Sequence, residues 1–497
     1  MGPILRRRLW AVIGLLVSVS AAAKAPNIVF ILTDDLDAAA AAQMPLVKSL
    51  ITNQGTNFRR HYVSLSLCCP SRVATLRGQF AHNTGIYTNN LPDGGFELTH
   101  SQGLESSTLA TWLTSAGYRT ALFGKYLNGY PDTAPADFVP PGWTEWMSPV
   151  AGDPHDGFNY TMNHNGKAEN HGSNENDYLT DVISDATAGF IRDSVNRFPE
   201  QPFFIYLAPY TPHSPATPAP RHAKAFKGIQ APRTASWNES DVSDKPAWVR
   251  TLPALNSTQI QGIDKLYRKR RQTLLSIDEM VQNVIQTLSD TGQLSNTYVL
   301  FSSDNGYHQG QHRLDSGKNT GFEEDILVPL YVRGPGVPAG RTEDRLTANV
   351  DYAPTFAEIA GIAAPSFVDG RSLLPLMHGQ TPPTWRQALL LEHKAGPGSK
   401  LVGKQKTPRE PADPWDALNI EGNGADGYVG LRLADGTTYL EYETGEHEVY
   451  NNINDPSQLR NIYLQTPPWN RQRLTDWTAA LKTASGAALR EAELDAP

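Results

Sequence analysis

Residues 27–35 read NIVFILTDD, an unbroken apolar run that ends in two aspartates. A short run of this kind predicts a strand that is buried on both faces of a sheet. Four further stretches have the same form, and they are 118-YRTALFGKY, 202-PFFIYLAPY, 297-TYVLFSSDNG and 327-LVPLYVRGP. Segments with helical spacing of apolar residues lie between them, at residues 104–117, 178–197 and 257–292. Strands that alternate with helices predict an α/β fold, with a mostly parallel sheet covered by helices on both faces.

A second, smaller part of the chain follows a Pro/Gly-rich segment at residues 395–426. Residues 427–451 form alternating strand-like pieces, with a hairpin signal at Asp435-Gly436. Together with a last helix near Trp469 to Ala487, they predict a small α+β subdomain built on an antiparallel sheet. The predicted division of the mature chain is residues 24–385 and residues 386–497.

The first residues have the layout of a secretory signal. Arg6, Arg7 and Arg8 precede an apolar run of about a dozen residues, and small residues follow at Ala21 to Ala23. The run is shorter than the roughly 20 residues that a bilayer-spanning helix needs. We therefore expect a signal peptide at residues 1–23 and a secreted protein without a membrane anchor.

The composition indicates which partners to expect. The 497-residue chain has a formal charge of −8 at pH 7, which becomes −11 when the three signal arginines are removed. An acidic chain without a block of basic residues is not expected to bind nucleic acid or an anionic membrane, so we expect small or sugar-like partners. Three Asn-x-Ser/Thr triplets are candidate N-glycosylation sites, and they begin at Asn159, Asn238 and Asn256.

Polar side chains cluster where the predicted strands end. Ligands of open α/β sheets bind at the carboxyl ends of the strands, so residues that follow several strands are expected to converge on one rim. Carboxylate and amide oxygens form a hard ligand set that suits Ca²⁺ or Mg²⁺ and not zinc or copper. Carboxylates placed together without a cation would repel one another, so we expect a bound divalent metal, and nearby lysines would suit an anionic substrate. The residues concerned are Asp34, Asp35, Asp304 and Asn305 for the metal, Lys125 and Lys318 for the anion, and His213 on the same rim.

Both cysteines of the chain stand side by side, as Cys68 and Cys69. Neighbours in sequence almost never form a disulfide, because the peptide link between them imposes an unfavourable geometry. Pro70 suits the first turn of a helix that continues through residues 71–78, which would place the cysteines at its positive end. The residues alone leave two interpretations: a reactive thiol of lowered pKa, or a buried and inert side chain.

The segment Cys68-Cys69-Pro70-Ser71-Arg72, with Leu76 and Gly78 following, resembles the sulfatase signature Cys-x-Pro-Ser-Arg-x-x-x-Leu-x-Gly. The resemblance extends over nearly the whole mature chain. It implies an alkaline-phosphatase-like α/β domain with a smaller carboxyl-terminal sheet. It also implies that a formylglycine-generating enzyme oxidises Cys68 to Cα-formylglycine before folding.

The resemblance carries site roles onto matching positions. It implies that calcium is held by Asp34, Asp35, Asp304, Asn305 and an oxygen of the modified Cys68. Sulfate-binding and supporting roles fall on Arg72, Lys125, His213 and Lys318, with His213 protonating the leaving group. Many sulfatases have Gly-Lys-x-His after the second strand, whereas this chain has Leu127 where that histidine would stand. Asn128 and His312 are candidates to replace it.

The expected activity is hydrolysis of sulfate esters, of the arylsulfatase type. The GKYLN and CCPSR patterns and 267-YRKRRQTLLSIDEM also resemble the N-acetylglucosamine-6-sulfatase branch, so a sulfated sugar is the alternative substrate. A phosphoesterase or phosphonate hydrolase on the same fold is the nearest rival activity. An inactive secreted binding protein and a cysteine hydrolase are more distant alternatives.

Overall fold

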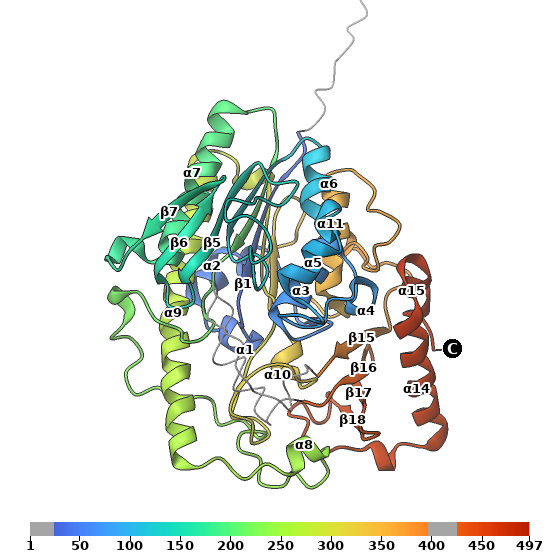
Figure 1. Cartoon of the computed structure of the whole chain (residues 1–497). Coiled ribbons are helices and arrows are strands. Elements are labelled where there is room, and N and C mark those ends of the chain that lie inside the picture. The colour runs from blue at the N-terminus through green and yellow to red at the C-terminus, as the bar shows by residue number, and fades with distance from the viewer. Residues whose placement is uncertain (1–23, 396–424, 497) are drawn as a thin grey trace, which may run out of the picture.

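A computed structural model of the chain describes residues 24–395 and 425–496. Its centre is a ten-stranded sheet with the order β13-β2-β12-β9-β1-β8-β4-β5-β6-β7. Figure 1 labels β1, β5, β6 and β7 of this sheet. Helices lie on both of its faces, as the alternation of strands and helices predicted. The bounds of its strands, in sheet order, are Arg341–Glu343, Thr56–Phe58, Leu330–Arg333, Thr297–Ser303, Asn27–Thr33, Phe203–Ala208, Arg119–Gly124, Glu145–Asp153, Phe158–His164 and Lys167–His171.

Five strands at the centre of the sheet, β9, β1, β8, β4 and β5, run parallel to one another. Antiparallel pairs flank them, β12 with β9 and β2 on one side and β5, β6 and β7 on the other. The sheet is therefore mixed. Because the central strands are parallel, their carboxyl ends meet on one rim, and this is the rim that carries the polar residues.

Strand β1 shows how the sheet separates two apolar cores. Its side chains alternate, so that Ile28, Phe30 and Leu32 face one core and Val29 and Ile31 face the other. All five are fully buried. The first core is covered by α3 (Cys68–Arg77), α5 (Gly95–Ser101), α6 (Leu109–Ser115) and α11 (Tyr352–Ile359), and the second by α2 (Pro45–Leu50), α7 (Leu179–Arg197) and α9 (Ser257–Asp290).

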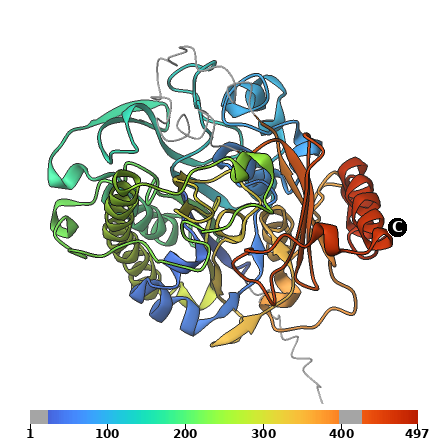
Figure 2. The ribbon, with the colours of Figure 1, turned by 90° about the horizontal axis from the view of Figure 1, so that it is seen from below.

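The carboxyl-terminal part contains a separate four-stranded antiparallel sheet. The strands are β15 (Ala388–His393), β16 (Tyr428–Leu433), β17 (Thr437–Tyr442) and β18 (His447–Asn451). The predicted hairpin joins β16 to β17, and Gly436 in its turn has a φ of 94°. Helices α14 (Pro468–Thr483) and α15 (Gly486–Ala492) lie beside this sheet at the end of the chain (Figure 2), where a single helix was predicted.

The structure differs from the predictions in two respects. The helix expected over residues 104–117 begins only at Leu109, because residues 104–106 form a separate 3₁₀ turn. Strands β5, β6 and β7 were not predicted: β5 contains Pro149 and register shifts, and much of β7 is exposed and polar. Such strands do not show the apolar run or the alternation by which strands are recognised.

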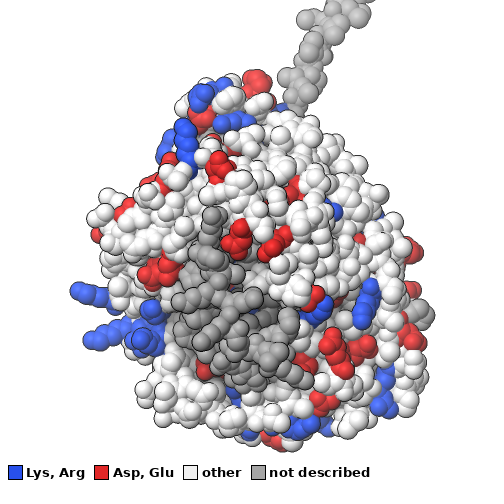
Figure 3. All heavy atoms as spheres, in the orientation of Figure 1, with Lys and Arg blue, Asp and Glu red and all other residues white. Residues whose placement is uncertain are grey.

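Several predictions lie wholly or mostly outside the described residues, among them the signal peptide at residues 1–23 and the Pro/Gly-rich segment. Asn159 and Asn256 are exposed, whereas Asn238 is partly buried and its Oδ1 accepts a hydrogen bond from the Leu255 amide at 2.8 Å. In the part of the chain that is described, no helix is both long and apolar enough to cross a bilayer. Acidic and basic side chains are both spread over the face that Figure 3 shows.

Candidate active site

The rim of the parallel strands brings the predicted residues together. Asp34 and Asp35 follow β1, Lys125 follows β4, and Asp304 and Asn305 follow β9. His213 lies in the turn after β8, where its amide donates to the Tyr210 carbonyl at 3.1 Å. Each of these side chains is at most 2% exposed. The arrangement of the rim is therefore as the strand ends predicted.

Helix α3 supplies the remaining groups. It begins at Cys68, carries Pro70 in its first turn and ends at Gly78, which has a φ of 67°. Cys68 and Arg72 are four residues apart and so lie on the same face of the helix. Every residue of α3 is buried, which places the charged Arg72 inside the protein beside the carboxylates.

Each of the three carboxylates has a cationic partner. Lys125 Nζ lies 2.6 Å from Asp34 Oδ2, and Lys318 Nζ lies 2.7 Å from Asp35 Oδ1. Arg72 donates from Nε to Asp304 Oδ2 at 2.8 Å. We predicted a bound divalent metal because these carboxylates, placed together without a cation, would repel one another. Lys125, Lys318 and Arg72 already balance the three charges, so repulsion alone does not require a metal.

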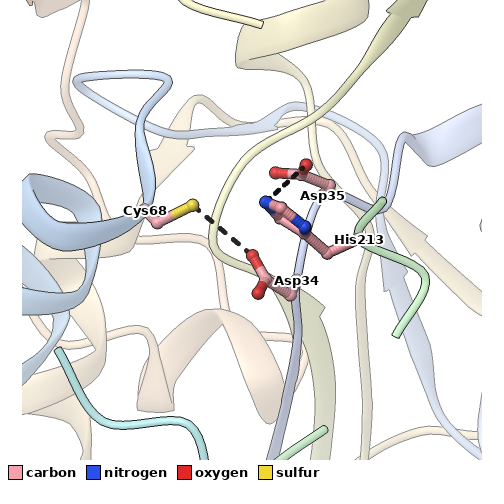
Figure 4. Close-up of side chains that lie close together, drawn as sticks. All are labelled: Asp34, Asp35, Cys68 and His213. Atoms are coloured by element: carbon pink, nitrogen blue, oxygen red, sulfur yellow. Dashed lines mark hydrogen bonds and ion pairs between the residues drawn. The ribbon is translucent and has the colours of Figure 1, made fainter. Parts of the chain in front are cut away.

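Four possible metal ligands converge between these ion pairs (Figure 4). One ligand atom each from Asp34, Asp35, Cys68 and His213 lies within 4.8 Å of the others. Cys68 Sγ is 3.5 Å from Asp34 Oδ1 and 2.8 Å from Lys318 Nζ. His213 Nε2 is 3.5 Å from Asp35 Oδ2. The sulfur of Cys68 thus lies among charged groups of both signs.

Asp304 and Asn305 lie beside this group and contact it through Asp35. Asn305 Nδ2 donates to Asp35 Oδ1 at 2.6 Å, and the Asp35 amide donates to Asp304 Oδ1 at 3.1 Å. Asn305 Oδ1 is buried and has no hydrogen-bond partner. A buried carbonyl oxygen without a partner is costly unless a cation or water binds it. The side-chain oxygens of Asp34, Asp35, Asp304 and Asn305 are therefore a ligand set that fits a hard cation.

Burial and neighbouring charges set the protonation states. Burial opposes ionisation of Asp34, but Lys125, His213 and the other cations outweigh it and hold the pKa of Asp34 well below its usual value. Burial, together with repulsion from Asp34, raises the pKa of Asp304 to about 6. Burial also raises the pKa of the Cys68 thiol to about 11. Burial thus outweighs the opposing charges of Lys125 and Lys318 and favours the thiol over the thiolate in the unmodified side chain.

The position of the absent histidine is apolar. Leu127 is 2% exposed and belongs to the apolar core that also contains Cys69. His312 lies in another cluster, where its ring stacks on Phe322 at 3.9 Å and its Nδ1 lies 2.6 Å from Glu239. Leu127 therefore offers no proton acceptor, and the His312 ring is held by Phe322 and Glu239.

His155 also lies at the rim, although it was not among the predicted residues, and its ring centroid is 4.6 Å from that of His213. It lies in the loop that follows β5, so it obeys the same strand-end rule as the other residues of the rim. The strand-end rule could not point to His155 in the sequence, because β5 itself was not recognised as a strand.

A buried set of carboxylates, cations and a helix-borne cysteine at the carboxyl rim of an alkaline-phosphatase-like sheet defines the class as an ester hydrolase of that fold. The model of the sulfatase family matches residues 26–362. Human N-acetylglucosamine-6-sulfatase is 36% identical over 486 residues, which cover 95% of this chain and 87% of the relative. An arylsulfatase of Chlamydomonas reinhardtii is 32% identical over 515 residues, which cover 95% of this chain and 76% of the relative.

The solved structure of BT4656 in complex with its substrate D-glucosamine-2-N,6-O-disulfate has the same fold, with a TM-score of 0.73 and 24% identity over 92% of this chain and 97% of that one. The chain belongs to the sulfatase family, as the signature at Cys68 indicated. It is a sulfuric ester hydrolase.

Proposed function

We propose that the protein is a secreted, calcium-dependent sulfatase of the arylsulfatase type, in which Cys68 is matured to formylglycine. The observation that carries the proposal is the position of Cys68. It is the first cysteine of the signature, it begins α3, and its sulfur contacts both Asp34 and Lys318. The Cys68 sulfur stands where the oxygens of the matured side chain would be. The proposed maturation requires a formylglycine-generating enzyme from the host.

Asp34, Asp35, Asp304 and Asn305 would hold the calcium, together with an oxygen of the matured residue 68. The unpartnered Oδ1 of Asn305 supports this assignment. Bound calcium would act as a Lewis acid beside the nucleophile, and the hydrated formylglycine would supply an oxygen nucleophile and a second hydroxyl for release of sulfate. When a cation takes over the carboxylates, Lys125 and Lys318 become available to bind an anionic substrate.

Arg72, Lys125 and Lys318 would bind the sulfate group and stabilise the charge on its oxygens during transfer, as cationic clamps do in phosphoryl transfer. All three are buried, so each interaction with a bound anion would be weakly screened by solvent. Burial also excludes bulk water from the reacting group.

His213 would protonate the leaving oxygen. Its Nδ1 lies 2.7 Å from the Ser214 carbonyl, to which only a protonated nitrogen can donate. Nε2, which lies 3.5 Å from Asp35 Oδ2, is then the nitrogen that would carry the proton for the leaving oxygen. A general acid of this kind contributes about 10²- to 10⁴-fold in rate.

N-acetylglucosamine 6-sulfate is a second candidate substrate. The relative named for that activity, from human, is 36% identical over 95% of this chain, which is closer than the arylsulfatase of Chlamydomonas reinhardtii at 32%. Aryl sulfates carry a good leaving group, whereas a sugar sulfate depends more strongly on the general acid. The two candidates therefore make different demands on His213.

The substrate proposal is tested by initial rates of the matured protein on nitrophenyl sulfate, nitrophenyl phosphate and N-acetylglucosamine 6-sulfate. Faster turnover of the aryl sulfate than of the sugar sulfate supports the arylsulfatase assignment, and the reverse order supports the second candidate. Faster hydrolysis of the phosphate would make the protein a phosphoesterase in practice. No turnover of any of the three would favour a binding protein.

The metal proposal is tested by elemental analysis of the purified protein before and after Asp304→Asn substitution. We expect one calcium in the parent protein, and loss of both calcium and activity in the variant, because a carboxylate ligand and the partner of Arg72 are removed together. Lys48→Gln, at the surface of α2, is the matched control and retains both. Bound calcium and normal turnover in the Asp304 variant would contradict the assignment.

A further inference from the structure

We propose that His155 is a positioning residue for the general acid, holding the imidazole of His213 in its working orientation. The inference rests on the proposed function, because it deepens the role given there to His213. It assigns a role to a second histidine on the rim of a chain that has Leu127 at the position of the family's usual histidine.

The fold brings His155 to the site. It lies in the four-residue loop between β5 and β6, two positions after the end of β5 at Asp153. Because β5 is parallel to β4, its carboxyl end points to the same rim as Lys125. The side chain of His155 is only partly buried, in contrast to the fully enclosed carboxylates of the rim.

The loop is fixed both to the segment that carries His213 and to the start of α7. Thr217 Oγ1 donates to Asp156 Oδ1 at 2.5 Å, and the Leu179 amide donates to the Gly157 carbonyl at 3.0 Å. Both residues of the loop that make these bonds are within two positions of His155. The position of its ring is therefore determined by the fold and not by a freely moving loop.

Two rings of a single turn contact His155. The His213 ring lies 4.6 Å away at an interplanar angle of 45°, and the Tyr210 ring lies 5.0 Å away in an edge-on arrangement at 87°. Tyr210 in turn lies 5.6 Å below Lys125 Nζ, measured to the ring centroid. His155 thus closes a continuous set of contacts from the general acid to the sulfate-binding lysine.

The chemistry explains why His213 needs this contact. Its hydrogen bond to the Ser214 carbonyl fixes the position of Nδ1, and the groups packed around the buried ring determine the direction of Nε2. Rotation would move Nε2 away from the leaving oxygen, and misplacement by about 1 Å can reduce a rate about 10²-fold. Packing of the His155 ring against His213 restricts that rotation. The contact acts through ring packing, so another aromatic ring can replace it.

The test compares His155→Ala, His155→Phe and His213→Ala on nitrophenyl sulfate and on an alkyl sulfate, with rates normalised to the formylglycine content measured by mass spectrometry. We expect His155→Ala to lose at least about 10-fold on the alkyl sulfate and much less on nitrophenyl sulfate, because the general acid matters most for a basic leaving group. His155→Phe should retain most of the activity. In a His213→Ala background, His155→Ala should cause no further loss, because the two residues act as one unit.

His171→Ala is the matched control, because this histidine stacks on Tyr160 at 4.8 Å on the same extension of the sheet. It should leave the ratio of the two rates unchanged. Equal losses on both substrates for His155→Ala, additive losses in the double variant, or a failure of His155→Phe to restore activity would each overturn the positioning role. If His213→Ala itself loses equally on both substrates, the general-acid role fails and this inference falls with it. A leaving-group effect in His213→Ala but not in His155→Ala overturns this inference alone.

Discussion

At the scale of single residues, two chemically identical neighbours have different surroundings. Successive residues of an α-helix point about 100° apart, so Cys68 and Cys69 face different sides of α3. Cys68 contacts Asp34 and Lys318, whereas Cys69 is enclosed by the apolar core. Both are free thiols and both are buried. Only their direction from the helix distinguishes them.

Cys68→Ala and Cys69→Ala are therefore expected to have opposite consequences. The first removes the only side chain that can become the aldehyde, so turnover of nitrophenyl sulfate should fall to background. The second removes a small buried side chain and should cost on the order of 1 kcal/mol of stability without loss of activity. Kinetics and urea unfolding measure the two effects. Turnover by the Cys68 variant would contradict the mechanism.

The same difference is visible by mass spectrometry. The tryptic peptide of residues 61–72 contains both cysteines. In the matured protein it should carry one free thiol and one residue in which one oxygen replaces sulfur and two hydrogens. Fragment ions that place the change on Cys69 would exclude Cys68 as the nucleophile precursor.

At the scale of elements, the site depends on where α3 ends. Gly78 stops the helix in a left-handed conformation with a φ of 67°, and its amide donates to Ala74 at 2.7 Å. A Cβ at this position would lie 2.9 Å from Val368 Cγ1 and 3.2 Å from Pro354 Cδ. Both the backbone and the surrounding core therefore favour glycine.

Gly78→Ala should destabilise the protein by more than the roughly 1–2 kcal/mol that a left-handed conformation costs an ordinary residue, because crowding adds to it. Gly103→Ala is the matched control: its φ is 66°, but no atom lies within 4 Å of the added Cβ. Urea unfolding of the two variants separates the two contributions. Equal losses in free energy of unfolding for Gly78→Ala and Gly103→Ala would show that the packing around Gly78 adjusts without cost.

The short pairing of β3 (His61–Tyr62) with β14 (Thr347–Ala348) contains a buried histidine. His61 Nδ1 lies 3.0 Å from Thr347 Oγ1, and Nε2 lies 2.6 Å from the Tyr352 hydroxyl. Burial lowers the pKa of His61 from 6.5 to about 3. Folding therefore favours the neutral ring, and this contribution to stability is complete above pH 6.5.

The contribution should be lost as the pH falls from 6.5 towards 3, because the unfolded chain binds the proton first. A pKa shift of this size lowers the free energy of unfolding by up to about 5 kcal/mol at pH values below 3. His61→Gln, which cannot titrate, should reduce the slope of unfolding free energy against pH by up to about 1.4 kcal/mol per pH unit between pH 6 and pH 4. An unchanged slope in urea titrations over this range would contradict the prediction.

At the scale of the whole molecule, a buried ion network joins the two parts of the chain. Arg386 is 1% exposed and lies just before β15. It donates to both oxygens of Asp351, at 2.7 and 2.8 Å, and to Glu493 near the end of the chain at 2.7 Å. One apolar core also contains residues of both parts, including Phe80 and Leu390. The two parts therefore share an interior, and the predicted boundary at residue 385 remains a prediction.

Arg386→Ala should lower stability by about 3–5 kcal/mol, because it leaves buried carboxylates without their cation. Calorimetry should still show one cooperative transition, shifted to lower temperature. Arg59→Ala is the matched control. The side chains of Arg59 and its partner Asp344 are 61% and 56% exposed, so this substitution should lower the free energy of unfolding by at most about 1 kcal/mol. Two separate transitions, or equal shifts in both variants, would contradict a shared interior.

Much of the fold followed from local pattern. The apolar runs that became β1, β4, β8, β9 and β12 are recognisable because a strand buried on both faces needs apolar residues at every position. The rim residues Asp34, Lys125 and Asp304 followed from the same runs, since parallel strands end on one side. The signature at Cys68 identified the family without any structure.

What the sequence by itself determined is therefore the α/β class, the carboxyl hairpin and the residues that the rim would gather. Only the tertiary structure decided which charges neutralise which, that burial raises the pKa of the Cys68 thiol, and that His155 packs against His213. Strands are recognised from the apolar surface that each buries, which is a local property. Ion pairs, pKa values and ring contacts depend on distances between residues such as Asp34 and Lys125, which are 91 positions apart in the chain. No local pattern contains those distances.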